Sequence, residues 1–100
     1  SMLTAAHAVA RAGGGLAVAS GDRVLALLPL PVAGLMSDQP AGDVARLNGL
    51  VEEAAATLGC PLASPFATLS FMALPVIPEL KLTDRGLFDV TAFAHISLQT

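Results

Sequence analysis

Apolar residues follow two different spacings in the first third of the chain, and each spacing predicts a different element. Residues 3–12 are rich in alanine, which loses little conformational entropy in a helix, and the glycines at 13–15 are expected to end that helix. Two short apolar runs within 16–28 surround the pair Gly21-Asp22, which is typical of a β-hairpin. Because both faces of the second run are apolar, we expect both to be covered.

A second helix is expected after a proline-rich apolar segment. Residues 29–38 contain two prolines two positions apart, which exclude a central strand and a helix interior, so we expect an extended apolar loop. Ser37 or Asp38 can then cap a helix in which apolar positions recur at helical spacing from Val44 to Leu58. The glycine that follows directly is expected to end this helix.

The last third of the chain is less regular. Residues 66–74 fit either a buried strand or a short helix, and the alternation of Thr68 and Ser70 with apolar residues favours the strand. A turn is expected around Gly86, and residues 93–98 predict a final strand.

Together these elements predict an α+β fold with a small antiparallel sheet flanked by two helices. A length of 100 residues suits one domain, so residues 1–100 are expected to form a single domain. Apolar residues make up 54% of the chain and charged residues 13%, whereas about 25% is usual in a soluble domain. A free-standing small domain needs a charged surface, so we expect another part of the protein to cover some of this one.

The charge distribution argues against two classes of partner. The five basic residues are scattered and the net charge is -3, which does not suit nucleic acid. The run 54–78 carries no charge, but its four prolines would interrupt a membrane helix, so we expect buried soluble structure and no membrane partner. A single cysteine, Cys60, suits a reducing cytoplasm.

The titratable side chains lack the spacing of a catalytic or metal site. His7 and His95 are the only histidines, and no H-x-H, H-E-x-x-H or C-x-x-C pattern occurs, so each histidine is expected to be structural. Cys60 follows a helix C-terminus, where the helix dipole disfavours a thiolate. We therefore expect no catalytic residue and no metal ligand in this chain.

Polar residues beside the two proline-containing loops are the candidates for contact with a substrate. They emerge from rigid apolar segments, as the wall of a preorganised pocket would. These candidates are Ser37, Asp38, Lys81, Thr83 and Asp84. In the alternative interpretation, which turn chemistry favours, Asp38 caps a helix while Asp84 and Gly86 shape a turn.

Three strings of residues resemble one family. They are GGGLAV at 13–18, LPLPVAGLMSD at 28–38 and PFATLSFMALPVIPELKLTDRGLFDV at 65–90. Over nearly its whole length the chain resembles the C-terminal region of bacterial adenine deaminases of the amidohydrolase superfamily. The resemblance implies a parent enzyme that hydrolyses adenine to hypoxanthine and ammonia with a divalent metal, manganese or iron, in a (β/α)₈ barrel.

None of the family's metal-binding motifs matches a position in this chain, so the resemblance implies an accessory domain. We expect it to be inactive alone, to hold no cofactor and to pack against the catalytic barrel of a cytoplasmic parent. A homo-oligomer is a further expectation. The alternative is an independent binding or dimerisation module with no enzymatic parent.

The uncharged run 54–78 provides a first test. If the parent protein buries it, Phe71→Asp should lower the free energy of unfolding of the intact protein by several kcal/mol, because the change buries an unpaired charge. The melting temperature of the intact variant measures this. An unchanged melting temperature would show that the side chain at this position is exposed in the parent.

Overall fold

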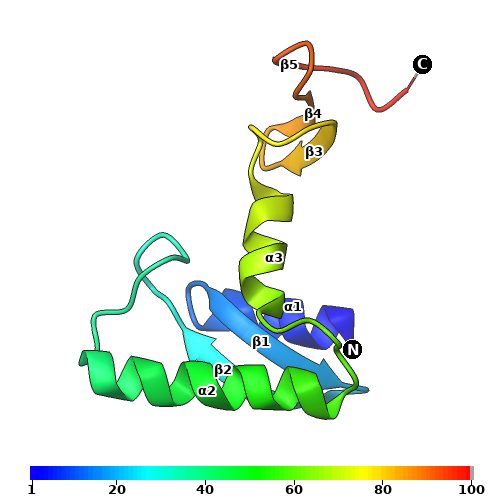
Figure 1. The fold of residues 1–100 in the computed structure, drawn as a ribbon. Helices are drawn as coiled ribbons and strands as arrows, with labels where there is room; N and C mark the ends of the chain where they lie inside the picture. Colours follow the sequence, from blue (N-terminus) through cyan, green and yellow to red (C-terminus); the bar gives the residue numbers. More distant parts are fainter. Residues whose placement is uncertain (100) are drawn as a thin grey trace. The chain divides into compact units, whose positions relative to one another are not determined.

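The computed structural model describes residues 1–99, which fall into two compact units. The first unit is Ser1–Ala63 and the second begins at Ser64. Each unit combines helix with antiparallel strands, which confirms the α+β expectation (Figure 1).

The first unit is a two-stranded antiparallel sheet with a helix on either side of it. In chain order it contains α1 (Met2–Arg11), β1 (Gly15–Ser20), β2 (Arg23–Pro29) and α2 (Ala41–Thr57). Both helices contact the hairpin, and Figure 1 shows α2 in front of the strands and α1 behind them. The expected hairpin and its two flanking helices are therefore confirmed.

The glycines after α1 let the end of β2 approach the backbone closely. Leu30 N–H donates to the Gly14 carbonyl oxygen at 2.9 Å. Gly15 has a φ of +144°, and a side chain on it would overlap the carbonyl oxygen of Leu28. Glycine is therefore required here for space as well as for its backbone conformation.

The buried apolar side chains all lie in the first unit, within the described part of the chain. They are Ala8, Val18, Leu28, Leu30, Val51 and Ala55. Val51 of α2 is 0% exposed, as the helical stripe predicts. The expectation that both faces of β2 are covered is wrong for its first residues, because Val24 and Leu25 are exposed and burial begins at Ala26.

The second unit contains a helix and a three-stranded antiparallel sheet. Its elements are α3 (Pro65–Ala73), β3 (Leu80–Thr83), β4 (Gly86–Asp89) and β5 (Ala94–His95). The sheet order is β3-β4-β5. The expected final strand over 93–98 is confirmed only for the two residues of β5.

The strand favoured for residues 66–74 is wrong, because this segment is the helix α3. Pro65 occupies its first turn, where the fixed φ of proline suits a helix. The Thr68 and Ser70 hydroxyls donate to carbonyl oxygens four residues earlier, at 3.2 and 2.9 Å. Both hydroxyls are thus satisfied within the helix, so their alternation with apolar residues carried no information about a sheet.

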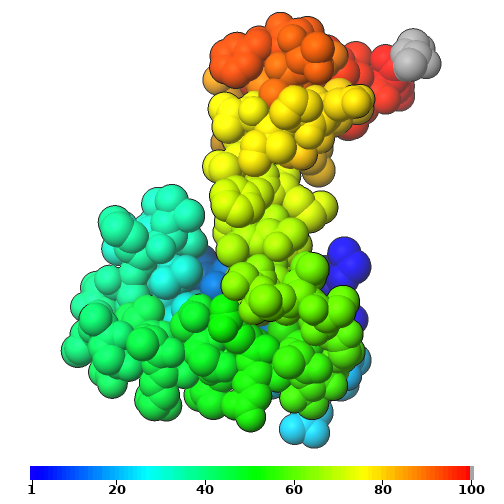
Figure 2. Space-filling model, viewed as in Figure 1, coloured from blue at the N-terminus to red at the C-terminus, as the bar shows by residue number. Residues whose placement is uncertain are grey.

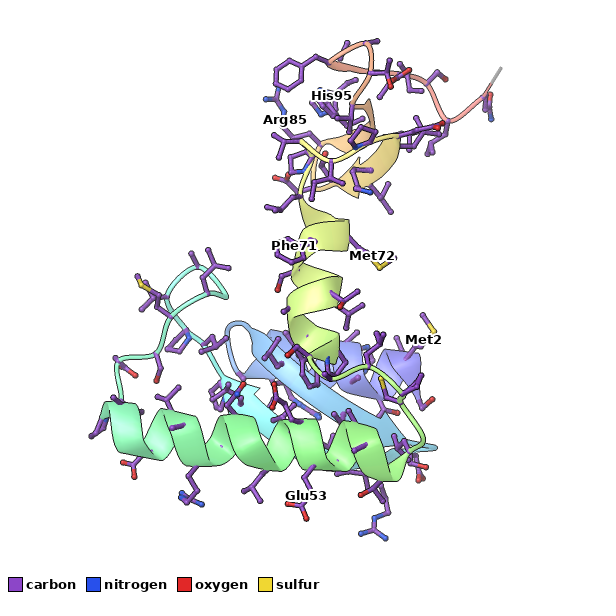
Figure 3. The ribbon with its side chains drawn as sticks, viewed as in Figure 1. Met2, Glu53, Phe71, Met72, Arg85 and His95 are labelled. Atoms are coloured by element: carbon purple, nitrogen blue, oxygen red, sulfur yellow. The ribbon has the colours of Figure 1, made fainter. Side chains whose placement is uncertain are left out.

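Residues 64–99 contain no buried apolar side chain. In α3, Phe71 is 60% exposed and Met72 is 61% exposed, and both side chains project away from the helix (Figure 3). The space-filling view shows atoms of α3 exposed along the helix (Figure 2). In this chain the run 54–78 is therefore largely exposed, contrary to the expectation of buried structure, and its burial in a larger protein stays a prediction. No helix within residues 1–99 is both long enough and apolar enough to cross a membrane.

Two glycines of the first unit should respond to alanine in opposite directions. Gly15→Ala should lower the free energy of unfolding by about 1–3 kcal/mol, because the new methyl group meets the Leu28 carbonyl and the backbone is strained. Gly49→Ala, the matched control inside α2, has no atom within 4 Å of the added carbon and should raise stability by about 0.5–1 kcal/mol. Urea unfolding followed by circular dichroism measures both values. Equal effects of the two changes would contradict the backbone contact at Gly15.

Candidate functional site

The five candidate residues fall in two places. Ser37 and Asp38 lie in the first unit, in the loop before α2. Lys81, Thr83 and Asp84 lie in the second unit, on β3 and in the turn that follows it. The structure thus gathers the candidates into a pair and a triplet.

The loop that carries Ser37 and Asp38 is organised by its own backbone. A bridge pairs Val32 with Met36, and the tip between them contains Ala33 at φ 58° and Gly34 at φ 73°. The side chains of Leu35 and Met36 are 76% and 61% exposed, and the loop projects from the first unit (Figure 2). This apolar loop therefore presents hydrophobic side chains to its surroundings.

Neither Ser37 nor Asp38 caps α2, so that structural expectation is wrong. The N-cap is Pro40, whose carbonyl oxygen accepts hydrogen bonds from the N–H groups of Asp43 and Val44 at 3.0 and 3.1 Å. The Ser37 hydroxyl oxygen instead accepts a bond from the Gln39 backbone N–H at 3.0 Å, and an Asp38 carboxylate oxygen accepts from the Gln39 side-chain amide at 3.3 Å. The first helical residue, Ala41, comes too late for either side chain to act as its cap.

A hollow of about 250 Å³ lies beside this loop. Its lining is formed by Pro29, Pro31, Ser37, Asp38, Gln39 and Leu47. The prolines and the leucine supply apolar walls, while the carboxylate and the hydroxyl are hydrogen-bonding groups. The arrangement suits contact with a small polar group, but it has no second charged residue to orient one.

In the second unit Thr83 fixes the turn between β3 and β4. Its hydroxyl donates to the Gly86 carbonyl oxygen at 2.9 Å and accepts from the Arg85 backbone N–H at 3.1 Å. Gly86 has a φ of +118°, and the backbone of any residue with a side chain would be strained in this conformation. The turn thus depends on Thr83 and Gly86, where Asp84 and Gly86 were expected, and the side chains of Asp84 and Arg85 are exposed.

An aromatic cluster lies next to this turn. Phe88 on β4 pairs in register with Lys81 on one side and His95 on the other. Its ring makes edge-to-face contacts with Phe93 at 5.3 Å and with His95 at 5.1 Å between ring centroids. Lys81, Phe88 and His95 therefore share one face of the sheet.

A hollow of about 190 Å³ is bounded by the cluster and the turn. Its lining is formed by Pro75, Val76, Thr83, Asp84, Arg85, Phe88, Phe93 and His95. Two of the candidates, Thr83 and Asp84, are among these residues, whereas Lys81 is not. The lining combines apolar and aromatic surface with a carboxylate, a guanidinium and an imidazole.

The sequence interpretation missed Arg85, Phe88 and Phe93, and it assigned His95 a structural role. The available signal was the polar cluster at the turn, because Arg85 follows Asp84 directly. The two phenylalanines had no such signal, since their meeting depends on the turn after β4. In that turn an Asp89 carboxylate oxygen accepts from the Ala92 backbone N–H at 3.0 Å.

The residues present do not fit a hydrolytic metal centre. Within residues 1–99 no group of three or more His, Cys, Asp or Glu side chains could hold a metal ion. His7 lies on α1 in the first unit and His95 lies on β5 in the second, and Cys60 is a free thiol. Metal-dependent hydrolysis usually takes three protein ligands around one ion.

The turn around Thr83 yields a stability prediction. Thr83→Val keeps the shape of the side chain but removes both hydrogen bonds, and should lower the free energy of unfolding by about 1–3 kcal/mol. Thr83→Ser keeps the hydroxyl and should cost less than half of that, and Asp84→Ala should cost still less. Chemical unfolding of the three variants measures this. A larger loss of stability for Asp84→Ala than for Thr83→Val would show that the turn depends on Asp84 and not on Thr83.

Comparison with known proteins places the chain in a family. A family model described as the adenine deaminase C-terminal domain matches residues 1–94. The chain is 62% identical over 100 residues to an adenine deaminase of Oleidesulfovibrio alaskensis and 54% identical over 97 residues to one of Desulfatibacillum aliphaticivorans. An adenine deaminase of Moorella thermoacetica is 48% identical over 99 residues. The chain spans 17% of the length of each of these relatives. It belongs to the family of adenine deaminase C-terminal domains.

Proposed function

We propose that the chain serves as an accessory domain packed against the catalytic part of an adenine deaminase, which hydrolyses adenine to hypoxanthine and ammonia. One observation carries this proposal. Relatives named adenine deaminase match almost the whole of this chain, whereas the chain covers only 17% of their length. The catalytic chemistry then belongs to the rest of such a protein.

The donor set supports that division. Hydrolytic deamination needs an activated water, which a divalent metal ion supplies when it is bound. The described residues offer no group of three ligands for such an ion. We therefore place the expected manganese or iron in the catalytic barrel of the parent and assign no catalytic residue to this chain.

Exposed apolar side chains support the packing role. The second unit has no buried apolar side chain among residues 64–99, while Leu69, Phe71 and Met72 of α3 are each more than half exposed. Full burial of one such side chain contributes about 1.5–3 kcal/mol. Covering α3 alone can therefore supply several kcal/mol to the docking of this unit on a larger protein.

Exposed apolar side chains that the catalytic part leaves uncovered can join two copies of the parent, so we propose a homo-oligomer as a further assembly. The single free cysteine, Cys60, is compatible with a reducing cytoplasm, which is where we place the enzyme. An independent binding or dimerisation module is the less favoured function, because the relatives are named adenine deaminase.

The chain alone should not deaminate adenine. We expect no ammonia release above a metal-only blank when a high concentration of the chain is incubated with adenine and manganese, iron or zinc, because the described residues offer no group of three ligands for one metal ion. A full-length adenine deaminase under the same conditions is the positive control. Turnover above the blank that survives repurification of the chain would overturn the assignment of the chemistry to another part of the protein.

A further inference from the structure

The hollow between the aromatic cluster and the β3–β4 turn has features that packing against a catalytic domain does not require. We infer that it binds the planar heteroaromatic ring of a purine base, with adenine or hypoxanthine as the ligand. The choice of base rests on the proposed function, whereas the ligand class follows from the lining of the hollow.

The aromatic residues form the stacking surface. Phe88 makes edge-to-face contacts with both Phe93 and His95, so three rings meet at this face of the sheet. Phe93 is 70% exposed, so its ring is available to a ligand. Bases stack well on such rings because each base presents a flat π-surface.

Phe93 adopts an unusual backbone conformation to reach this position. Its φ is 53°, in the left-handed region that bulky residues rarely occupy. Such strain persists where the surrounding structure imposes it, and it concentrates at ligand sites. The burial of Phe93 does not offset the strain here, because most of the side chain is exposed. A ring stacked on Phe93 would cover its exposed face and add to the contact that it makes with Phe88.

The polar groups around the hollow match the edge of a base. The Asp84 carboxylate can accept from an amino group or a ring N–H, and the Arg85 guanidinium can donate to a ring nitrogen or a carbonyl oxygen. Figure 3 shows the side chains of Arg85 and His95 at the same end of the second unit. The two hydrogen bonds of Thr83 hold the turn that carries Asp84 and Arg85.

Charge and size favour a free base over a nucleotide. The charges of Asp84 and Arg85 are opposite, so they leave no net positive charge to attract a phosphate group. The hollow of about 190 Å³ is smaller than the 300–1,000 Å³ typical of sites for drug-sized ligands. It therefore suits one ring system without its sugar and phosphate.

Titration of the ¹⁵N-labelled 100-residue chain with adenine, and separately with hypoxanthine, tests this inference by NMR. We expect weak, saturable binding with amide shifts at Phe88, Phe93 and His95. Phe93→Ala should weaken binding about tenfold, because it removes the stacking ring. The matched control is Phe71→Ala, which removes a similarly exposed ring from α3 outside the hollow and should leave the Kd unchanged. Phe93→Trp, which keeps an aromatic ring, should retain binding.

If Phe93→Ala unfolds the second unit, Arg85→Met provides the same test from an exposed side chain, and it should weaken the binding of both bases several-fold. Adenosine monophosphate should bind more weakly than adenine. The inference would be overturned by the absence of a saturable shift with either base. It would also be overturned if Phe93→Ala or Arg85→Met bound the bases as tightly as the unsubstituted chain does, or if the nucleotide bound more tightly than adenine. The readout is binding without turnover, so such a failure leaves the proposed function to its own ammonia assay.

Discussion

The packing of α2 and α1 on the β1–β2 hairpin is the interaction on which the rest of the structure depends. Val51 and Ala55 of α2, with Val18 and Leu28 of the hairpin, are among the few side chains that the chain buries. A chain that is 54% apolar yet buries so little must leave hydrophobic surface exposed. This constraint explains why the second unit, which has no buried apolar residue among residues 64–99, is better understood as part of a larger protein.

Elements defined by local chemistry were predictable from the sequence. The alanine-rich α1 ends at a run of glycines, the hairpin turns at Gly21-Asp22, and α2 shows an apolar stripe at helical spacing. The helix α3 was not predictable in this way. Its polar residues Thr68 and Ser70 have the spacing of polar positions in a strand, although their hydroxyl groups donate to carbonyl oxygens of the same helix. The start of α2 was also misplaced, because the carbonyl of Pro40 serves where a side-chain cap was expected.

The same distinction applies to the candidate site: one part of it follows from neighbouring residues in the sequence, and another part depends on contacts between residues that are distant in the sequence. Asp84 could be placed in a turn because Gly86 follows it closely, but the two hydrogen bonds by which Thr83 holds this turn were not foreseen. The aromatic cluster could not be foreseen, because it requires the register that brings Phe88 opposite His95 and the left-handed backbone at Phe93. The family was recognisable from three strings of residues, and the match over residues 1–94 confirms it. Contact between any of these residues and a substrate stays a proposal.

The exposed apolar surface is the centre of this account, and methionine oxidation tests it most directly. Met36 in the apolar loop and Met72 on α3 are each 61% exposed in the chain by itself. We expect hydrogen peroxide to oxidise both rapidly in the isolated chain, and at least tenfold more slowly when the same residues are part of a full-length adenine deaminase that covers them. Mass spectrometry of the digested proteins gives both rates. Equal rates in the two proteins would show that the surface stays open to solvent, and would contradict the packing of this domain against the rest of the enzyme.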